Sequence, residues 1–143
     1  MRILLDTQAI IKIINNSKDI DDSIKNDVDY FQHHFFVSTV TLQEFVIIKS
    51  LGKIETQYSL EEFVKNLLSK QIHILDILQK HIFQLEKLPY ITFIDPITNK
   101  KTTHTDPFDR LLIAQAKCEK LTIATTDAKF KYYPDLKIID VSK

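Results

Sequence analysis

Residues 106–127, DPFDRLLIAQAKCEKLTIATTD, contain an amphipathic segment, a short apolar run and an acid at each end. Asp106 followed by Pro107 is typical of a helix start, and apolar residues then recur at three- and four-residue spacing. The run Leu121–Thr125 is short, apolar and rich in β-branched residues, as buried parallel strands are. A helix that leads into a buried strand, with Asp127 directly after it, predicts an α/β fold with a parallel sheet.

The same alternation of short apolar runs and amphipathic stretches extends along the whole chain. The expected strands are Arg2–Leu5, Phe35–Ser38, Ile72–Leu75, Leu121–Thr125 and Lys137–Val141. The expected helices are Thr7–Asn15, Asp21–Gln32, Thr41–Leu51, Leu60–Ser69, Leu78–Leu88 and Pro107–Glu119. Right-handed crossovers would place these helices on both faces of a sheet of about five strands. The stretch 90–104 alternates, passes Asp95-Pro96 and returns through polar residues, so we expect a hairpin-like insertion there within a single domain, 1–143.

Composition excludes several classes of function. With 143 residues and 44% hydrophobic side chains the chain is long and apolar enough for one buried core. Its 19 basic and 19 acidic residues create no global electrostatic field that would attract nucleic acid or a membrane, so any nucleic-acid contact is expected to be a local patch.

The single cysteine, Cys118, excludes a disulfide framework and favours a cytoplasmic location. The single glycine, Gly52, excludes glycine-rich phosphate loops, and thus a nucleotide cofactor bound in that way. Polar residues from Asp6 onward interrupt the N-terminal apolar run, so we expect no signal peptide and no membrane span.

Four acids occupy positions that a parallel sheet brings to one edge. Asp6 follows the first strand, Glu44 lies in the helix after the second, Asp109 opens the last long helix, and Asp127 follows the fourth strand. Each has a plain alternative role at a helix start, where acids cap free amides, and Thr41 to Glu44 also fits a capping box. Carboxylates gathered within a few ångströms repel one another unless a cation lies between them. Oxygen ligands suit Mg²⁺ or Mn²⁺, and such an ion activates water for phosphodiester hydrolysis.

The segments LLDTQAII (4–11), VSTVTLQEFVIIKSLGK (37–53) and DPFDRLLIAQAKCEKLTIATTDAKF (106–130) together resemble the PIN-domain family. They are most similar to its VapC-type toxins of type II toxin–antitoxin systems, in the DPFDR subgroup. The resemblance covers nearly the whole chain. It implies a three-layer α/β/α fold with strand order 3-2-1-4-5 and a ribonuclease that depends on Mg²⁺ or Mn²⁺. It also implies an RNA substrate, a cognate antitoxin protein as partner, and a homodimer.

The resemblance assigns roles to particular residues. Asp6, Glu44 and Asp109 match the three core acids of the family, and Asp127 matches its usual fourth. Supporting positions that hold these acids and their water molecules would be Thr7, Asp106 and Thr125. The candidates for RNA contact are Lys12, Lys49, Lys53, His104 and Arg110. The chain departs from the close subgroup in one place, because Tyr90–Thr103 separates Leu88-Pro89 from His104 beside the expected site.

Two other functions compete with a ribonuclease. A non-catalytic PIN-like module would bind RNA or a protein without turnover, although such a domain would most often have lost one of the acids. A phosphoryl-accepting receiver would need an acceptor Asp after the third strand, where Asp76 stands, and a lysine after the fifth, where only Lys143 follows. We give the remaining histidines no role, since none has a partner at metal-ligand spacing in the sequence.

Overall fold

The computed structural model describes residues 1–16, 33–54 and 58–142, with side chains of residues 12–16 left aside. Its centre is a parallel sheet of five strands in the order β3-β2-β1-β6-β7. These strands are β1 (Arg2–Leu5), β2 (His34–Ser38), β3 (His73–Leu75), β6 (Thr122–Thr125) and β7 (Ile138–Asp140). In register, Leu5 lies opposite Val37 on one side and Ala124 on the other. The first strand is therefore central, which confirms the expected order.

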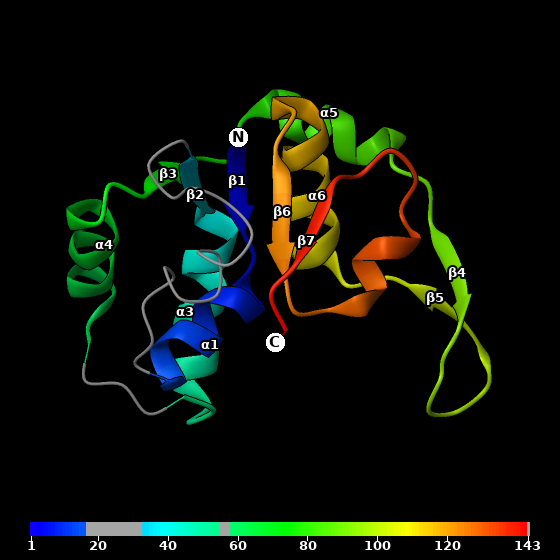
Figure 1. The fold of residues 1–143 in the computed structure, drawn as a ribbon, viewed down its shortest axis with the longest axis horizontal. Coiled ribbons are helices and arrows are strands. Elements are labelled where there is room, and N and C mark those ends of the chain that lie inside the picture. The colour runs from blue at the N-terminus through cyan, green and yellow to red at the C-terminus, as the bar shows by residue number, and fades with distance from the viewer. Residues whose placement is uncertain (17–32, 55–57, 143) are drawn as a thin grey trace.

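Helices cover both faces of this sheet (Figure 1). They are α1 (Thr7–Asn16), α3 (Thr39–Ser50), α4 (Leu60–Ser69), α5 (Gln79–Lys87) and α6 (Pro107–Glu119). Ile3 and Leu5 of β1 pack into one apolar cluster with α1, α3 and α4, whereas Leu4 points to the opposite cluster with α6. This alternation explains why β1 is apolar throughout, since a strand covered on both faces has no solvent side. None of the helices in the described ranges has the length and hydropathy of a membrane span.

The predicted elements agree with the structure apart from their ends and one capping assignment. The expected helix Asp21–Gln32 lies outside the described residues. Helix α3 begins at Thr39, because the Ser38 hydroxyl at the end of β2 accepts the amide of Val40 at 3.0 Å. The capping box expected from Thr41 to Glu44 was therefore wrong: both residues lie within the helix, and Thr41 is fully buried. Glu44 has no capping role.

Residues 90–104 form a hairpin outside the main sheet. Strands β4 (Ile91–Ile94) and β5 (Lys101–His104) pair antiparallel as a separate two-stranded sheet. Figure 1 shows this hairpin projecting at the right, beyond the 3-10 helix η2 (Ala128–Tyr132). Its last residue, His104, lies two residues before the cap of α6, so the hairpin is joined directly to the acidic edge.

Candidate functional site

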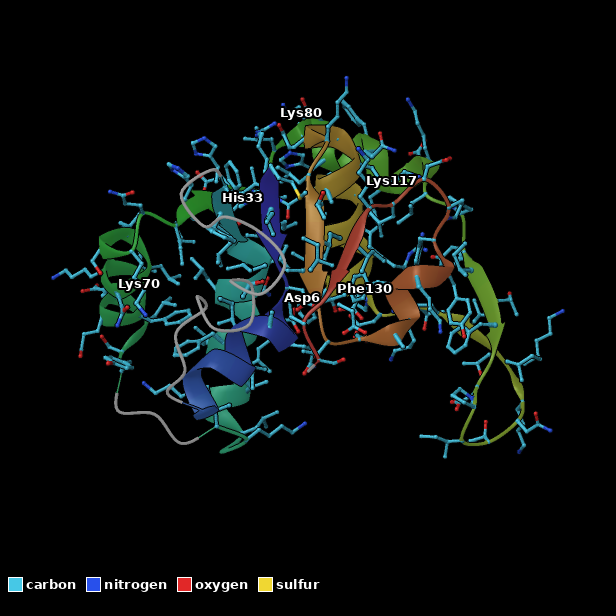
Figure 2. The ribbon with its side chains drawn as sticks, in the orientation of Figure 1. Asp6, His33, Lys70, Lys80, Lys117 and Phe130 are labelled. Carbon is cyan, nitrogen blue, oxygen red and sulfur yellow. The ribbon has the colours of Figure 1, made fainter. Side chains whose placement is uncertain are left out.

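The carboxyl edge of the sheet carries the four acids from four separate segments. Asp6 directly follows β1, Glu44 lies in α3, Asp109 is the third residue of α6, and Asp127 follows β6. Figure 2 shows Asp6 at the lower end of β1, with Lys80 and Lys117 above it. The electrostatic neighbours of Asp109 include the other three acids, so the fold gathers all four predicted carboxylates in one region.

Asp6 is the buried centre of this region, with 1% of its surface exposed. Its backbone amide donates to the carbonyl of Ala124 at 3.1 Å and continues the pairing of β1 with β6. One carboxylate oxygen accepts the amide of Ala9 at 2.8 Å, which caps α1. The other accepts the hydroxyl of Thr125. The capping role considered for Asp6 is thus present, and its carboxylate is held by two donors.

Glu44 is held by a hydroxyl rather than by a helix end. The Thr7 hydroxyl donates to its Oε1 at 2.6 Å, and Thr41 lies 3.2 Å from the same hydroxyl. Thr7 thus fixes one oxygen of Glu44. The contact of the buried Thr41 hydroxyl with Thr7 was not foreseen, since the sequence indicated only a capping role for Thr41.

Asp109 is contacted by His104, the last residue of the hairpin. His104 Nε2 lies 3.1 Å from Asp109 Oδ2, and His104 Nδ1 lies 2.5 Å from the hydroxyl of Tyr133. Burial lowers the pKa of His104, so its ring is neutral near pH 7. A neutral ring that donates from Nε2 to the carboxylate and accepts the Tyr133 hydroxyl at Nδ1 satisfies both contacts. His104 thus positions Asp109, and Tyr133 is a further residue of the site that no sequence signal indicated.

Two other acids at this edge have capping roles. Asp106 Oδ1 accepts the amides of Phe108 and Asp109 at 2.9 and 3.1 Å and caps α6. Asp127 Oδ1 accepts the amide of Lys129 at 2.9 Å, and its own amide donates to the Thr125 hydroxyl at 2.9 Å. Thr125 therefore links Asp127 to Asp6.

Crowding of negative charge perturbs the titration of the site. Burial, together with the charges of Asp127 and Glu44, raises the pKa of Asp6 from 3.8 to about 6. Burial and the surrounding acids raise the pKa of Asp109 from 3.8 to about 7. Burial also raises the pKa of Glu44, with Asp106 adding to the effect. The folded chain thus holds these carboxylates together at an electrostatic cost that a bound cation would remove.

The donor chemistry of the site fits a hard divalent cation. Within the described ranges, no group donates a hydrogen bond to Glu44 Oε2 or Asp109 Oδ1, so both oxygens are open to a ligand. The four acids do not bring three ligand atoms within 4.8 Å of one another, a spacing that the described residues reach elsewhere. Mg²⁺ is commonly held by one or two carboxylates with water completing its shell, and such a shell spans more widely separated acids.

Two of the remaining candidates for RNA contact, Lys49 and Arg110, donate hydrogen bonds to backbone carbonyls. Lys49 donates to the carbonyl of Tyr58 at 2.6 Å in the last turn of α3, and Lys53 is exposed beyond that helix. The side chain of Lys12 lies outside what the structure describes. The buried guanidinium of Arg110 donates to the carbonyls of Leu88 and Pro89 and stacks on the Tyr90 ring, so it fastens the hairpin base instead.

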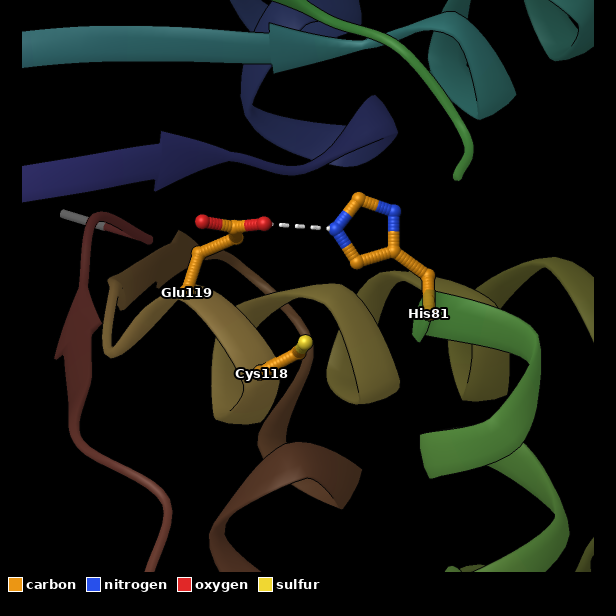
Figure 3. Close-up of side chains that lie close together, drawn as sticks. All are labelled: His81, Cys118 and Glu119. Atoms are coloured by element: carbon orange, nitrogen blue, oxygen red, sulfur yellow. Dashed lines mark hydrogen bonds and ion pairs between the residues drawn. The ribbon is translucent and has the colours of Figure 1, made fainter. Parts of the chain in front are cut away.

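A second cluster lies at the opposite end of α6 (Figure 3). One ligand atom from each of His81, Cys118 and Glu119 lies within 4.8 Å of the other two. The sequence did not indicate this cluster, because His81 has no partner at metal-ligand spacing along the chain. His81 Nδ1 accepts the amide of Leu78 at 2.9 Å, which leaves Nε2 protonated to donate to Glu119 at 2.8 Å. Glu119 also pairs with Lys80 at 2.8 Å. These hydrogen bonds occupy the groups that a metal would need, and His81 is a satisfied structural histidine.

The sequence model of the PIN domain matches residues 3–136 of this chain. The chain belongs to the PIN-domain family. No curated protein sequence matches it.

Solved structures share the whole PIN fold with this chain. VapBC from Salmonella typhimurium bound to DNA has 20% identity and a TM-score of 0.67, over 99% of this chain and 98% of that one. VapBC2 from Rickettsia felis bound to a promoter DNA fragment has 19% identity and a TM-score of 0.66, over 98% of each chain. VapBC-1 from Haemophilus influenzae has 18% identity and a TM-score of 0.66, over 100% of each chain. At these identities the likeness concerns the fold.

Proposed function

We propose that this PIN domain is a metal-dependent endoribonuclease and the toxin of a toxin–antitoxin pair. One observation carries the proposal: Glu44 and Asp109 perform no capping role, yet the fold places both beside the buried Asp6. Asp6, Asp106 and Asp127 are explained in part by the helices they cap. Burying two further carboxylates beside Asp6 is unfavourable for stability, so their presence favours a function that requires negative charge.

Asp6, Glu44, Asp109 and Asp127 would hold Mg²⁺ or Mn²⁺. The ion supplies Lewis acidity, which lowers the pKa of a bound water and stabilises charge on the scissile phosphate. The protein's part is to hold the oxygens that face the ion. Thr7 orients Glu44, Thr125 orients Asp6, and His104 orients Asp109. In Glu44 and Asp109 the donor bonds one carboxylate oxygen and leaves the other without a hydrogen bond in the described ranges. Cleavage would leave a 5′-phosphate and a 3′-hydroxyl.

The expected partners are an antitoxin and a second copy of the chain. The Salmonella typhimurium and Rickettsia felis structures are VapBC complexes bound to DNA, which supports an antitoxin partner here. A short open reading frame next to this gene would be the first candidate for the antitoxin. Measuring the mass of the purified protein in solution, alone and after co-expression with that frame, tests the homodimer and the complex.

The enzymatic proposal is tested by incubating total RNA with the purified protein in Mn²⁺, in Mg²⁺ or in EDTA. The Asp109→Asn variant keeps the side-chain volume and removes the ligand charge, and we expect it to abolish cutting. The exposed Asp76 provides a matched control, since Asp76→Asn removes the same charge from a residue that does not perturb the pKa of Asp6 or Asp109. Cutting in EDTA, or equal cutting by Asp109→Asn, would contradict the proposed mechanism. Absence of cutting by folded, antitoxin-free protein would favour the alternative, a PIN-like module that only binds RNA or protein.

A further inference from the structure

The β4–β5 hairpin is fastened to the acidic edge at its base and is open to solvent along its length. His104, the last residue of β5, contacts Asp109 at 3.1 Å, and Arg110 contacts the carbonyls of Leu88 and Pro89 just before β4. The register places Ile91, Phe93, Thr102 and His104 on one face of the hairpin. That face is the more buried one, and it turns toward η2 and the site.

An aromatic pair joins the hairpin to η2. Phe93 of β4 stacks on Tyr132 of η2, with ring centroids 5.0 Å apart and an interplanar angle of 10°. Tyr132 remains 39% exposed. The ammonium of Lys131 lies 5.3 Å from the centre of the Tyr132 ring. An exposed ring, held flat by a second ring and flanked by a cation, has the chemistry of a stacking platform for a nucleic-acid base.

Exposed lysines lie on the hairpin and on η2, whereas the chain as a whole is neutral. Lys100 and Lys101 are exposed at the start of β5, and no carboxylate in the described ranges forms an ion pair with either. The nearest acid in the hairpin, Asp95, accepts the amide of Ile97 at 2.8 Å within the turn. Lys129 reaches the site itself, 3.6 Å from Asp127. Cationic side chains therefore extend from the hairpin tip to the acids.

We propose that the β4–β5 hairpin and η2 form a platform for single-stranded RNA, with Tyr132 stacking on a base and Lys100, Lys101 and Lys131 contacting phosphates. The inference deepens the proposed function and rests on its RNA substrate. Rings on the hairpin and η2, with unpaired ammonium groups near the hairpin tip, match the bases and phosphates of one strand. Ile94, which pairs with Lys101, and Ile97 are also exposed near the tip and suit a protein contact, but the lysines beside them and the exposed Tyr132 ring favour RNA.

The phosphate contacts are tested by fluorescence anisotropy with a short, unstructured, labelled RNA in EDTA, which prevents cleavage. The double variant Lys100→Ala/Lys101→Ala should bind more weakly than wild type. If both lysines contact phosphates, the slope of log affinity against log salt should fall by about 1.4, or roughly 0.7 for each contact. Lys65→Ala/Lys87→Ala removes two exposed lysines from α4 and α5 and should bind as wild type.

The stacking contact is tested separately. Tyr132→Leu keeps an apolar contact to Phe93 and removes the ring, and we expect binding to weaken by roughly 5- to 150-fold, the range for one stacked base. Tyr132→Phe keeps the ring and should restore binding. Thermal melting of each variant separates this effect from loss of the hairpin, because Tyr132→Phe and Tyr132→Leu should both retain the fold.

The outcomes separate this inference from the nuclease proposal. Hairpin-dependent RNA binding by a protein that never cuts in Mn²⁺ would support the platform and overturn the nuclease. Metal-dependent cutting with unchanged RNA affinity in the folded lysine and Tyr132→Leu variants would overturn the platform alone. Lack of RNA binding by wild type would overturn the platform as well. An equal loss of RNA affinity in Lys65→Ala/Lys87→Ala would also overturn it, because binding would then depend only on non-specific charge.

Discussion

Replacing Asp109 by asparagine should stabilise the metal-free protein at about pH 8, even though it removes a proposed catalytic group. Burial and neighbouring acids raise the pKa of Asp109 from 3.8 to about 7. In the unfolded chain the carboxyl ionises near its ordinary pKa, so above about pH 7 the folded state carries a charge that the unfolded state bears more easily. Asparagine has the same shape and no charge at any pH.

The size of the effect follows from two opposing contributions. A pKa difference of roughly 3, with about 1.4 kcal/mol for each tenfold step, sets a ceiling of about 4 kcal/mol. The charged hydrogen bond from His104, 3.1 Å away, becomes a neutral one, which costs about 1 to 2 kcal/mol. A net gain of about 2 kcal/mol should raise the melting midpoint by about 5 °C.

Thermal melting in EDTA across the pH range from about 4 to 8 is the assay. The free energy of unfolding of wild type should fall as pH rises from 3.8 through about 7, because there the folded state binds more protons than the unfolded state. The advantage of Asp109→Asn should be largest at high pH and disappear near pH 4, with Asp76→Asn as control. Equal stability of Asp109→Asn and wild type at about pH 8 would refute the inference that this carboxylate is held against repulsion.

Three further outcomes are expected. Mn²⁺ should raise the melting midpoint of wild type more at about pH 8 than at about pH 5, because at the lower pH protons on Asp6 and Asp109 compete with the ion. Equal shifts of the melting midpoint at the two pH values would contradict a metal site made of these acids. Thr125→Val should lower RNA cleavage by roughly 10- to 100-fold while the fold is retained, and Thr125→Ser should recover most of it, as assayed by initial rates. Gln115→Leu, which removes the partner of Ser38 at 2.5 Å in the core, should lower the free energy of unfolding by about 2 kcal/mol in denaturant titration, whereas an unchanged value would mean that the Ser38 hydroxyl finds another partner.

The parts of the fold that the sequence predicted are those set by burial. Strands such as β1 and β6 are covered on both faces, so they appear as continuous apolar runs, and helices such as α6 carry a strong cap and a periodic face. The start of α3 was misplaced because Ser38 ends an apolar strand and caps a helix at once. A serine between an apolar strand and an amphipathic segment is itself a helix-start signal, so this error was avoidable.

The parts that escaped prediction depend on contacts between distant segments. The four acids share the local signature of strand ends and helix starts, and for that reason their gathering could be expected. Tyr133 pairs with His104 across 29 residues, and His81 pairs with Glu119 across 38, with nothing in the local pattern to indicate either contact. Buried polar pairs of this kind are fixed by tertiary packing, which a single sequence does not reveal.

The position of β1 at the centre of the sheet has a consequence during synthesis. One neighbour of β1, β2, follows within the first 38 residues, but the other, β6, ends only at Thr125, whose hydroxyl holds Asp6 from 119 residues away. A nascent chain on the ribosome therefore lacks both the second neighbour of its central strand and the acid at Asp127 until residues 122–127 have emerged. The acidic edge is assembled only at that point in synthesis.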